Sequence, residues 1–473
     1  MTELTGHGVQ ELAQLLQART VSSVEVTQAF LKRIGEGDRA RAWVRTYPEM
    51  ALEQAAAADA RLSAAAVGRD GPAPPLCGVP FGLKDVIAVA GLPLTLGSAA
   101  FEDQVGGEDA SSWERLRDQG AVPLGHTRTQ ELASGDAPQT VANPWDLGRS
   151  PGGSSNGSAA AVAAGTAPFA LGTDVGGSLR RPASACGLTT IIGTAGRVSM
   201  RGSFTFNAAA DHVGPLAWSA ADCALVLAVL AGHDPGDAAT HGAPPLGALP
   251  TAPTPGERPL AGRRIGVLEL PPEIELAPSV AEVQARFEEE LRRLGAELLP
   301  VAGPPRPPAD PRPRQEQVTF FRRHLAERGD RFTAYTRERG VALLEAAEAL
   351  GVAPADAGRA EQAYRAAWAA LFREHELSAL ALPAQTRETP LVPPADEGGD
   401  LERFGDQGIR AMWNVLGWPV VCLPAGGEDG GLPIGAQLAG APWTEAALLQ
   451  TAIDYQSRTP HHESRPPATL PPR

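Results

Sequence analysis

A glycine- and serine-rich stretch from Arg149 to Gly187 constrains this chain more than any other segment of it. It holds two clusters of small residues, GGSSNG at 152–157 and DVGGS at 174–178, and an alanine-rich segment joins them. Glycine at this density lets backbone amides approach a ligand closely and adopt dihedral angles that other residues avoid. A flexible Gly/Ser linker would not enclose the apolar runs AAAVAAG and PFALGT. The stretch therefore predicts a helix followed by a buried strand, with a small-residue loop at either end.

Serine side chains among closely spaced amides are suited to acyl transfer, which needs a nucleophile beside hydrogen-bond donors for an oxyanion. The chain is long enough to build a large core around such a site, with 473 residues, 43% of them hydrophobic and 20% charged. These proportions are ordinary for a globular protein that is soluble in water. The stretch is thus a candidate enzyme site within a conventional globular fold.

Charge and hydropathy exclude several classes of partner. The formal net charge of −14 argues against broad nucleic-acid binding, which depends on a basic surface. The N-terminus lacks the basic and apolar regions of a signal peptide. No run approaches the roughly 18 apolar residues of a membrane span. We therefore predict a cytoplasmic protein that acts on a small molecule, with neither nucleic acid nor membrane as partner.

The two lysines of the chain stand out against its arginines. Of 41 basic residues only Lys32 and Lys84 are lysines. Arginine stays protonated in proteins, whereas a buried lysine can lose its proton and act as a base. Lys32 ends an amphipathic helical pattern, but Lys84 lies in the apolar segment GVPFGLKDVI, which predicts a strand. Lys84 is therefore either paired with a carboxylate such as Asp85 or Asp174, or shifted to a low pKa.

The order of predicted elements favours an α/β fold with one large sheet. Residues 1–66 predict an N-terminal helical segment, and 67–232 alternate strands and helices around the small-residue clusters. A Pro/Gly-rich excursion follows at 233–262, then a second strand-containing half at 263–460 and a tail at 461–473. Strands continue to the end of the chain, so we expect a single domain over 1–473 in which both halves complete one sheet.

Common cofactor and metal motifs do not fit this sequence. The glycine-rich stretch matches neither a phosphate-binding loop nor a dinucleotide fingerprint, and the nine histidines form no zinc-ligand pattern. We therefore expect no metal and no cofactor. Residues 153–157 match the G-x-S-x-G pattern of α/β-hydrolase esterases, with Ser155 as nucleophile. That motif requires a strand running into the serine, and the preceding DLGRSP is unsuited to a central strand.

An arrangement of one lysine and two serines fits the residues better. A neutral lysine can act as general base, and a second serine can relay the proton from a nucleophile beyond its reach. Lys84, Ser154, Ser178 and the amides of 175–178 supply the residue types that this chemistry needs.

The same segments resemble the amidase signature family. The resemblance rests on RSPGGSSNGSAAAVAAG followed by LGTDVGGSLRRPAS, on GVPFGLKD for the lysine, and on NPWDL, GRVS, HVGPLAWS and GLPIGAQLAG in the same order along the chain. It extends from about Val21 to Gln456. The family fold that it implies is a single α/β/α domain whose central mixed, mostly parallel sheet is covered by helices on both faces. The segment Thr190–Arg197 departs from the usual family pattern.

The resemblance implies a role for each matching residue. Lys84 would be the base, Ser154 the bridging serine after a cis peptide bond, and Ser178 the nucleophile that forms an acyl-enzyme. The remaining implied roles are an oxyanion hole at Val175, Gly176, Gly177 and Ser178, support from Ser155, Asp174 and Arg180, and contact with the substrate amide at Leu132 and Ala133.

The function implied first is a stand-alone amidase that hydrolyses a carboxylic amide to a carboxylate and ammonia. The glutaminase (A) subunit of a tRNA-dependent amidotransferase is the alternative. In that protein the usual counterpart of the loop ELASGDAPQTVANPWDL is longer, and the region at 412–414 favours a free-standing enzyme. A catalytically silent binding protein and an α/β-hydrolase-type esterase are the other readings. Related amidases are often dimers, so the resemblance allows a homodimer.

Overall fold

Eleven strands join into one sheet in the order β1-β3-β2-β4-β6-β5-β10-β11-β9-β7-β8. The computed structural model describes residues 4–68, 71–135, 137–307, 310–353, 358–392, 408–427 and 431–467. The strands are β1 (Trp43–Thr46), β2 (Pro80–Lys84), β3 (Val122–Thr127), β4 (Phe169–Asp174), β5 (Thr189–Ile192), β6 (His212–Ala217), β7 (Arg264–Glu269), β8 (Glu297–Ala302), β9 (Ala379–Pro383), β10 (Val420–Gly427) and β11 (Pro433–Ala439). The sheet unites both halves of the chain through β5, which pairs with β6 and with β10.

The sheet is mixed, as expected, but it is not mostly parallel. Among the described residues β2 is parallel to β3 and β4, and β7 is parallel to β8 and β9. The pairs β1–β3, β4–β6, β5–β6, β5–β10, β10–β11 and β9–β11 are antiparallel. The short connection between β10 and β11 forces an antiparallel pair, because a parallel neighbour needs a long crossover. The parallel crossovers are thus confined to the two ends of the sheet.

Helices cover both faces of the sheet and enclose two apolar cores. Successive side chains of a strand point to opposite faces, and Ile191 and Ile192 accordingly belong to different core clusters. One cluster includes side chains of α7 (Ala220–Leu230), α8 (Pro278–Arg293) and α13 (Glu445–Gln456). The other includes side chains of α6 (Arg180–Cys186), α11 (Arg359–Glu374) and α12 (Gly408–Leu416). The α/β/α arrangement expected from the sequence is confirmed.

The predicted helix and strand of the glycine-rich stretch form as α5 (Asn156–Ala163) and β4. Every residue of α5 is buried, which explains its alanines: a helix packed on all sides against the sheet has no room for large side chains. The segment at 188–217, which lacks a clear strand pattern, nevertheless contributes β5 and β6 to the middle of the sheet.

The N-terminal segment is not wholly helical. It contains α1 (Val9–Gln17), α2 (Ser23–Gly35) and α3 (Pro48–Ala66), with β1 between the last two. Ser22 and Glu25 form the capping box of α2, as the spacing predicts. α4 (Ser111–Asp118) precedes β3.

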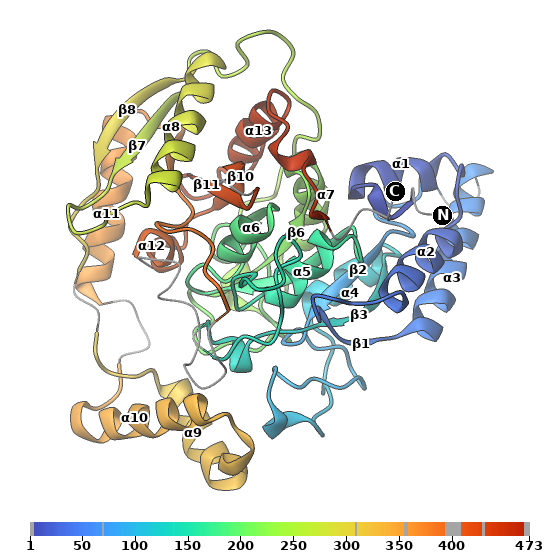
Figure 1. The fold of residues 1–473 in the computed structure, drawn as a ribbon, viewed down its shortest axis with the longest axis horizontal. Coiled ribbons are helices and arrows are strands. Elements are labelled where there is room, and N and C mark those ends of the chain that lie inside the picture. The colour runs from blue at the N-terminus through green and yellow to red at the C-terminus, as the bar shows by residue number, and fades with distance from the viewer. Residues whose placement is uncertain are drawn as a thin grey trace.

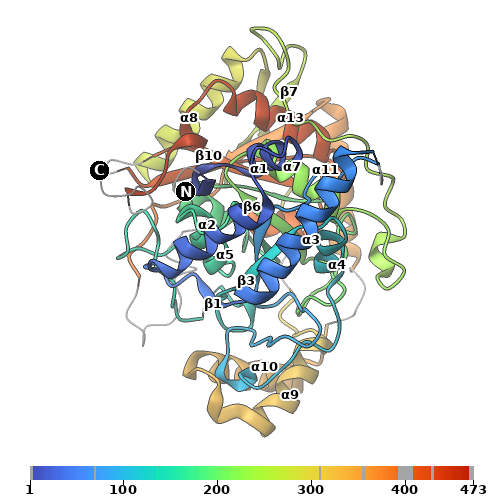
Figure 2. The ribbon, with the colours of Figure 1, turned by 90° about the vertical axis from the view of Figure 1, so that its right-hand side faces the viewer.

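Two helices of the second half stand apart from the sheet. Figures 1 and 2 show α9 (Gln315–Arg328) and α10 (Ala334–Leu350) together at one end of the molecule, connected by the turn Gly329–Arg331. We call this pair the α9–α10 hairpin. The beginning of the tail at 461–473 also packs on the protein, because the Arg465 guanidinium stacks on the Trp218 ring, 3.6 Å from its centroid. Residues 468–473 lie outside the described part.

Within the described ranges, none of the helices combines the length and the apolar character needed to cross a bilayer.

Candidate active site

Lys84 ends strand β2 and lies at the centre of the site. Its side chain is completely buried, and its Nζ donates to Ser154 Oγ at 2.8 Å and to Thr173 Oγ1 at 2.9 Å. The carboxylates considered as its partners are engaged elsewhere, since Asp85 accepts hydrogen bonds from Thr95 and Asp174 binds Arg180. The structure thus places the lysine among hydroxyl groups.

Burial and neighbouring charges determine the protonation of Lys84. Removal from water lowers its pKa from 10.5 to about 7, because the charged ammonium loses its hydration. Asp211 and Asp174 act in the opposite direction, and Arg181 adds to the lowering. Burial raises the pKa of Asp211, and Lys84 opposes that rise. A substantial fraction of Lys84 is therefore neutral near pH 7, as a general base requires.

Ser154 lies in the loop before α5, where the Gly153–Ser154 peptide bond is cis. Its carbonyl accepts from Thr129 Oγ1 at 3.1 Å and from Gln130 N–H at 3.4 Å, which ties this loop to the segment before Leu132. A Cβ at Gly153 would lie 1.8 Å from Gln130 Oε1, so a larger residue there would displace the Gln130 side chain. The loop is thus packed closely enough to fix the Ser154 hydroxyl beside Lys84.

Ser178 lies in the loop between β4 and α6 and is 7% exposed. It lines a cavity of about 360 Å³, so its side chain is accessible to a ligand. Its carbonyl accepts from Ser155 N–H at 3.1 Å, and this backbone contact connects it to the Lys84–Ser154 pair. The two small-residue clusters of the sequence therefore meet at one place.

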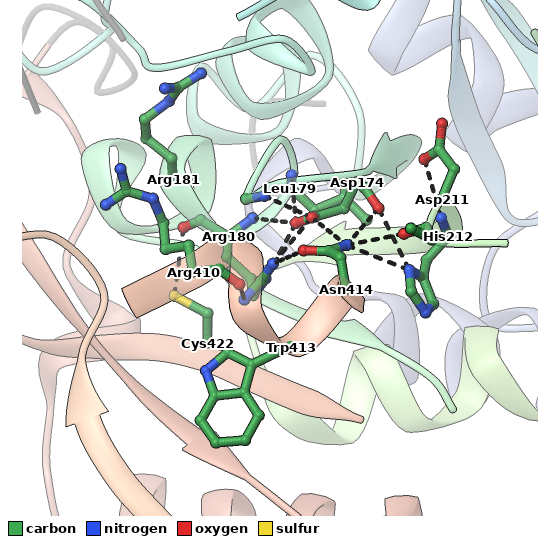
Figure 3. A network of polar contacts seen from close by, with 12 residues as sticks. Asp174, Leu179, Arg180, Arg181, Asp211, His212, Arg410, Trp413, Asn414 and Cys422 are labelled. Atoms are coloured by element: carbon green, nitrogen blue, oxygen red, sulfur yellow. Dashed lines mark hydrogen bonds and ion pairs between the residues drawn. The ribbon is translucent and has the colours of Figure 1, made fainter. Parts of the chain in front are cut away.

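Asp174 organises the loop that carries Ser178 (Figure 3). Its carboxylate accepts from the backbone of Gly177 at 2.7 Å and of Leu179 at 3.0 Å. Arg180 adds an ion pair at 3.0 Å. Burial raises the pKa of Asp174, but Arg180 and these backbone donors outweigh burial and hold the pKa well below its usual range. The loop is thus wrapped around a carboxylate that is ionised at neutral pH.

Residues far along the chain complete this network. Arg180 also donates to Asn414 Oδ1 at 2.6 Å and to Gln437 Oε1 at 3.1 Å, and Asn414 Nδ2 donates to the Asp174 carbonyl at 2.8 Å. Figure 3 shows Asn414 on α12 pointing toward both Asp174 and His212. Asn414 and Gln437 were not among the expected site residues. The sequence signal for these two residues was that each is a polar residue within an otherwise apolar helix or strand pattern.

The four amides expected in the oxyanion hole are not equivalent. Val175, Gly176 and Ser178 line the cavity, whereas the Gly177 N–H donates to the Asp174 carboxylate. Gly177 has φ +109°, and a Cβ there would lie 2.8 Å from Arg410 Cδ. Its role is therefore the shape of the turn, and we leave its amide out of the candidate donors.

Ser155, the residue of the G-x-S-x-G match, has a backbone role. Its hydroxyl donates to the Thr173 carbonyl at 3.1 Å, and its oxygen accepts from the Thr173 N–H at 3.2 Å. It begins α5 directly after the loop, and no strand leads into it. The geometry is therefore unlike that of an esterase nucleophile.

Leu132 and Ala133 line the cavity at a short 3-10 turn formed by Glu131–Ala133. Both have positive φ, 53° and 54°, which is unfavourable for residues with a Cβ. The Leu132 N–H donates to the Leu96 carbonyl at 2.8 Å and the Ala133 N–H to the Gln130 carbonyl at 2.9 Å. These two hydrogen bonds hold the backbone of the turn in place beside the cavity.

The remaining walls of the cavity were not predicted. Three phenylalanines line it, Phe204, Phe206 and Phe321, and the rings of Phe206 and Phe321 stack with centroids 5.7 Å apart. Charged lining comes from Arg181, Asp211, Arg314 and Arg339. Gln317, Phe321, Thr336 and Arg339 belong to the α9–α10 hairpin, Arg314 directly precedes it, and Ala411 lies on α12. Nothing in a helical pattern indicates which distant loop a helix will face.

No group of three or more His, Cys, Asp and Glu side chains within the described ranges has an arrangement that could hold a metal ion.

Comparison with known proteins identifies the family. The Amidase family profile matches residues 25–449. The A subunit of glutamyl-tRNA(Gln) amidotransferase from Chloroflexus aggregans is 36% identical over 499 aligned positions, which cover 98% of this chain and 99% of that protein. The protein of the same name from Cupriavidus metallidurans is 35% identical, with 97% and 98% covered.

Solved structures give the same result at the level of the fold. Peptide amidase from Stenotrophomonas maltophilia superimposes with a TM-score of 0.75 at 29% identity, covering 97% of this chain and 98% of that one. The 6-aminohexanoate cyclic dimer hydrolase superimposes with a TM-score of 0.79 at 26% identity, covering 98% and 99%. This chain therefore belongs to the amidase signature family and is an enzyme acting on carbon–nitrogen amide bonds.

Proposed function

We propose that the chain hydrolyses a carboxamide through an acyl-enzyme on Ser178, with Lys84 as base and Ser154 as proton relay. The observation that carries this proposal is the 2.8 Å contact between Lys84 Nζ and Ser154 Oγ, in a site whose cavity reaches Ser178. A buried, partly neutral lysine next to a hydroxyl has no obvious structural purpose in a chain that otherwise uses arginine.

In this mechanism the Ser178 hydroxyl attacks the amide carbonyl while its proton passes through Ser154 to neutral Lys84. The amides of Val175, Gly176 and Ser178 stabilise the oxyanion that develops. The carbon–nitrogen bond then breaks, and the proton returns along the same path so that ammonia leaves. Water attacks the resulting ester by the same relay, which releases the carboxylate and restores Ser178.

The chain offers a matched control for the base. We expect Lys84→Ala and Ser178→Ala each to reduce ammonia release from an amide panel by at least about 10³-fold. Lys32 is the only other lysine of the chain and lies at the exposed end of α2. Lys32→Ala is expected to leave the rate of ammonia release unchanged. Full activity in both Lys84→Ala and Ser178→Ala would refute the proposal.

The same chemistry could serve a free-standing amidase or a glutaminase subunit, and these two differ in the substrate that supplies the carboxamide. The curated relatives favour the glutaminase subunit of an amidotransferase over the free-standing amidase that the sequence resemblance implies first, since they are A subunits at about 35% identity over nearly their whole length. The cavity lining supports the same choice. Glutamine carries a carboxylate and an ammonium group beyond its carboxamide. The cavity lining offers arginine side chains for the carboxylate and Asp211 for the ammonium group.

The free-standing amidase remains a candidate on two observations. The family resemblance implies that the loop at 131–147 is shorter than its usual counterpart in the amidotransferase, and three phenylalanines in the cavity suit an apolar acyl group. Ammonia release by the purified chain alone from glutamine and from aliphatic and aromatic amides separates the versions. A free-standing amidase turns over simple amides without any partner, whereas a glutaminase subunit prefers glutamine and requires its partner subunits for full rate.

A further inference from the structure

A buried carboxylate that the mechanism does not use lies beside the substrate cavity. Glu131 is 4% exposed, and its carboxylate accepts from Ser98 Oγ at 2.6 Å. It also accepts from the Thr333 backbone N–H at 3.2 Å and from the Thr333 hydroxyl. Burying a carboxylate is unfavourable unless such donors surround it, and here Ser98 and Thr333 supply them.

The partners of Glu131 belong to two separate walls of the cavity. Glu131 begins the strained turn that carries Leu132 and Ala133. Thr333 is the N-cap of α10, where its hydroxyl oxygen accepts from the Thr336 N–H. Thr336 itself lines the cavity. One carboxylate therefore connects the turn that faces the substrate amide with the first turn of α10.

The rest of the hairpin is attached through apolar contacts, through exposed ion pairs, and through two arginine hydrogen bonds, from Arg328 to the Ala100 carbonyl at 2.6 Å and from Arg339 to Ser134 Oγ. Phe101 packs on Phe320 and Phe332 with ring centroids 5.8 and 5.9 Å apart. Arg328 and Arg331 form ion pairs with Asp103 and Glu102 that are open to solvent. These contacts hold the hairpin on the body of the protein through exposed ion pairs and long, flexible arginine side chains, whereas Glu131 binds the first turn of α10 through a buried carboxylate.

We propose that Glu131 is a positioning residue that fixes the α9–α10 hairpin against the Leu132–Ala133 turn and thereby sets which acyl groups fit. Its carboxylate supplies the directional hydrogen bonds that place the hairpin wall, including Phe321 and Arg339, at a defined distance from Ser178. The expected effect on kinetics rests on the amidase function proposed above. The effect of Glu131 on KM is larger for substrates whose acyl group reaches the hairpin, and it is absent for the smallest amides.

The test compares Glu131→Gln with Glu345→Gln, the same substitution at an exposed glutamate of α10. Hydrogen exchange at the amides of residues 336–344 is expected to be at least about tenfold faster in Glu131→Gln and unchanged in Glu345→Gln. For 3-phenylpropionamide the KM is expected to rise about tenfold in Glu131→Gln, whereas kcat/KM for acetamide stays within about twofold of wild type.

Variants of Thr333, the hydrogen-bond partner of Glu131, distinguish loss of this contact from a general folding defect. Thr333→Val removes the hydroxyl and is expected to reproduce both effects, whereas Thr333→Ser retains the hydroxyl and is expected to preserve wild-type values. Unchanged exchange in Glu131→Gln, or an equal loss of kcat/KM for both amides, would overturn the assignment. Wild-type protein that releases ammonia from neither these amides nor glutamine would refute the proposed function instead, and the exchange result would still decide whether Glu131 fixes the hairpin.

Discussion

At the scale of single residues, Lys84 concentrates the chemistry of the site. Complete burial lowers its pKa, and the two hydroxyl groups of Ser154 and Thr173 take the place of the carboxylate that a structural lysine would have. A lysine in this setting can accept a proton near neutral pH, which an exposed lysine cannot do.

The lowered pKa predicts the pH dependence of amide hydrolysis. The active form of Lys84 is neutral, so kcat/KM is expected to rise with pH and level off above a pKa of about 7. An unshifted lysine would give the same rise only near its ordinary pKa of 10.5. A pH–rate profile between pH 5 and 10 measures this directly, and an acid limb above pH 9 would contradict it.

Asp211 provides an independent check on the same group. Its negative charge raises the pKa of Lys84, so Asp211→Asn is expected to move the acid limb of the profile to lower pH. Asp118→Asn, at an exposed aspartate paired with Arg117, is expected to leave the limb in place. A shift of the limb to higher pH in Asp211→Asn would show that Asp211 acts in another way.

At the scale of elements, the β4–α6 loop depends on one buried ion pair. Arg180 and Asp174 are both fully buried, and Asp174 also binds the backbone of the loop. Removing Arg180 alone leaves a buried carboxylate without its cation. We expect Arg180→Met to lower the free energy of unfolding by about 3–5 kcal/mol at pH 7. In contrast, Arg286→Met, which breaks an exposed pair with Glu282 on α8, is expected to cost less than about 1 kcal/mol.

The sign of the pH effect on this pair follows from Asp174. Its folded pKa lies below its unfolded value, so its stabilisation is present above the unfolded pKa and is lost as the pH falls through the folded value. The difference between wild type and Arg180→Met is therefore expected to narrow as the pH falls, because the buried carboxyl group of the variant, without its cation, is protonated at a pH where that of wild type is still ionised. Urea titrations at pH 7 and at pH 3.5 measure it, and a constant difference would argue against an electrostatic origin.

At the scale of the whole molecule, the two halves share one sheet and one site. β5 pairs with β6 from the first half and with β10 from the second, and Arg180 contacts Asn414 and Gln437. We therefore propose that residues 1–473 behave as a single domain. Native-state hydrogen exchange is expected to give the same opening free energy for β4 and β10. Two clearly different values would indicate separately folding halves.

The local pattern of the sequence was sufficient for much of the fold and for a set of candidate site residues. Its apolar and polar spacing predicts α5, β4 and a strand over 78–87 that carries Lys84, because burial imposes those periods on the chain; the observed strand is shorter and ends at Lys84. It also gave Lys84, Ser154 and Ser178 as candidates, since lysine is otherwise nearly absent and the serines lie in glycine clusters that local chemistry alone makes unusual.

Pairing, partners and cavity walls depended on contacts between distant residues. The antiparallel centre of the sheet, the burial of β6 and the engagement of the Gly177 amide by Asp174 follow from neighbours that spacing does not specify. The same holds for Thr173 beside Lys84 and for Glu131 beneath the hairpin. The spacing of apolar residues along the sequence indicates which face of a helix or strand is buried. Only the packed structure determines which residues that face contacts. Sequence alone thus determined the fold class and the candidate reacting groups, and tertiary structure decided how those groups are oriented and what surrounds them.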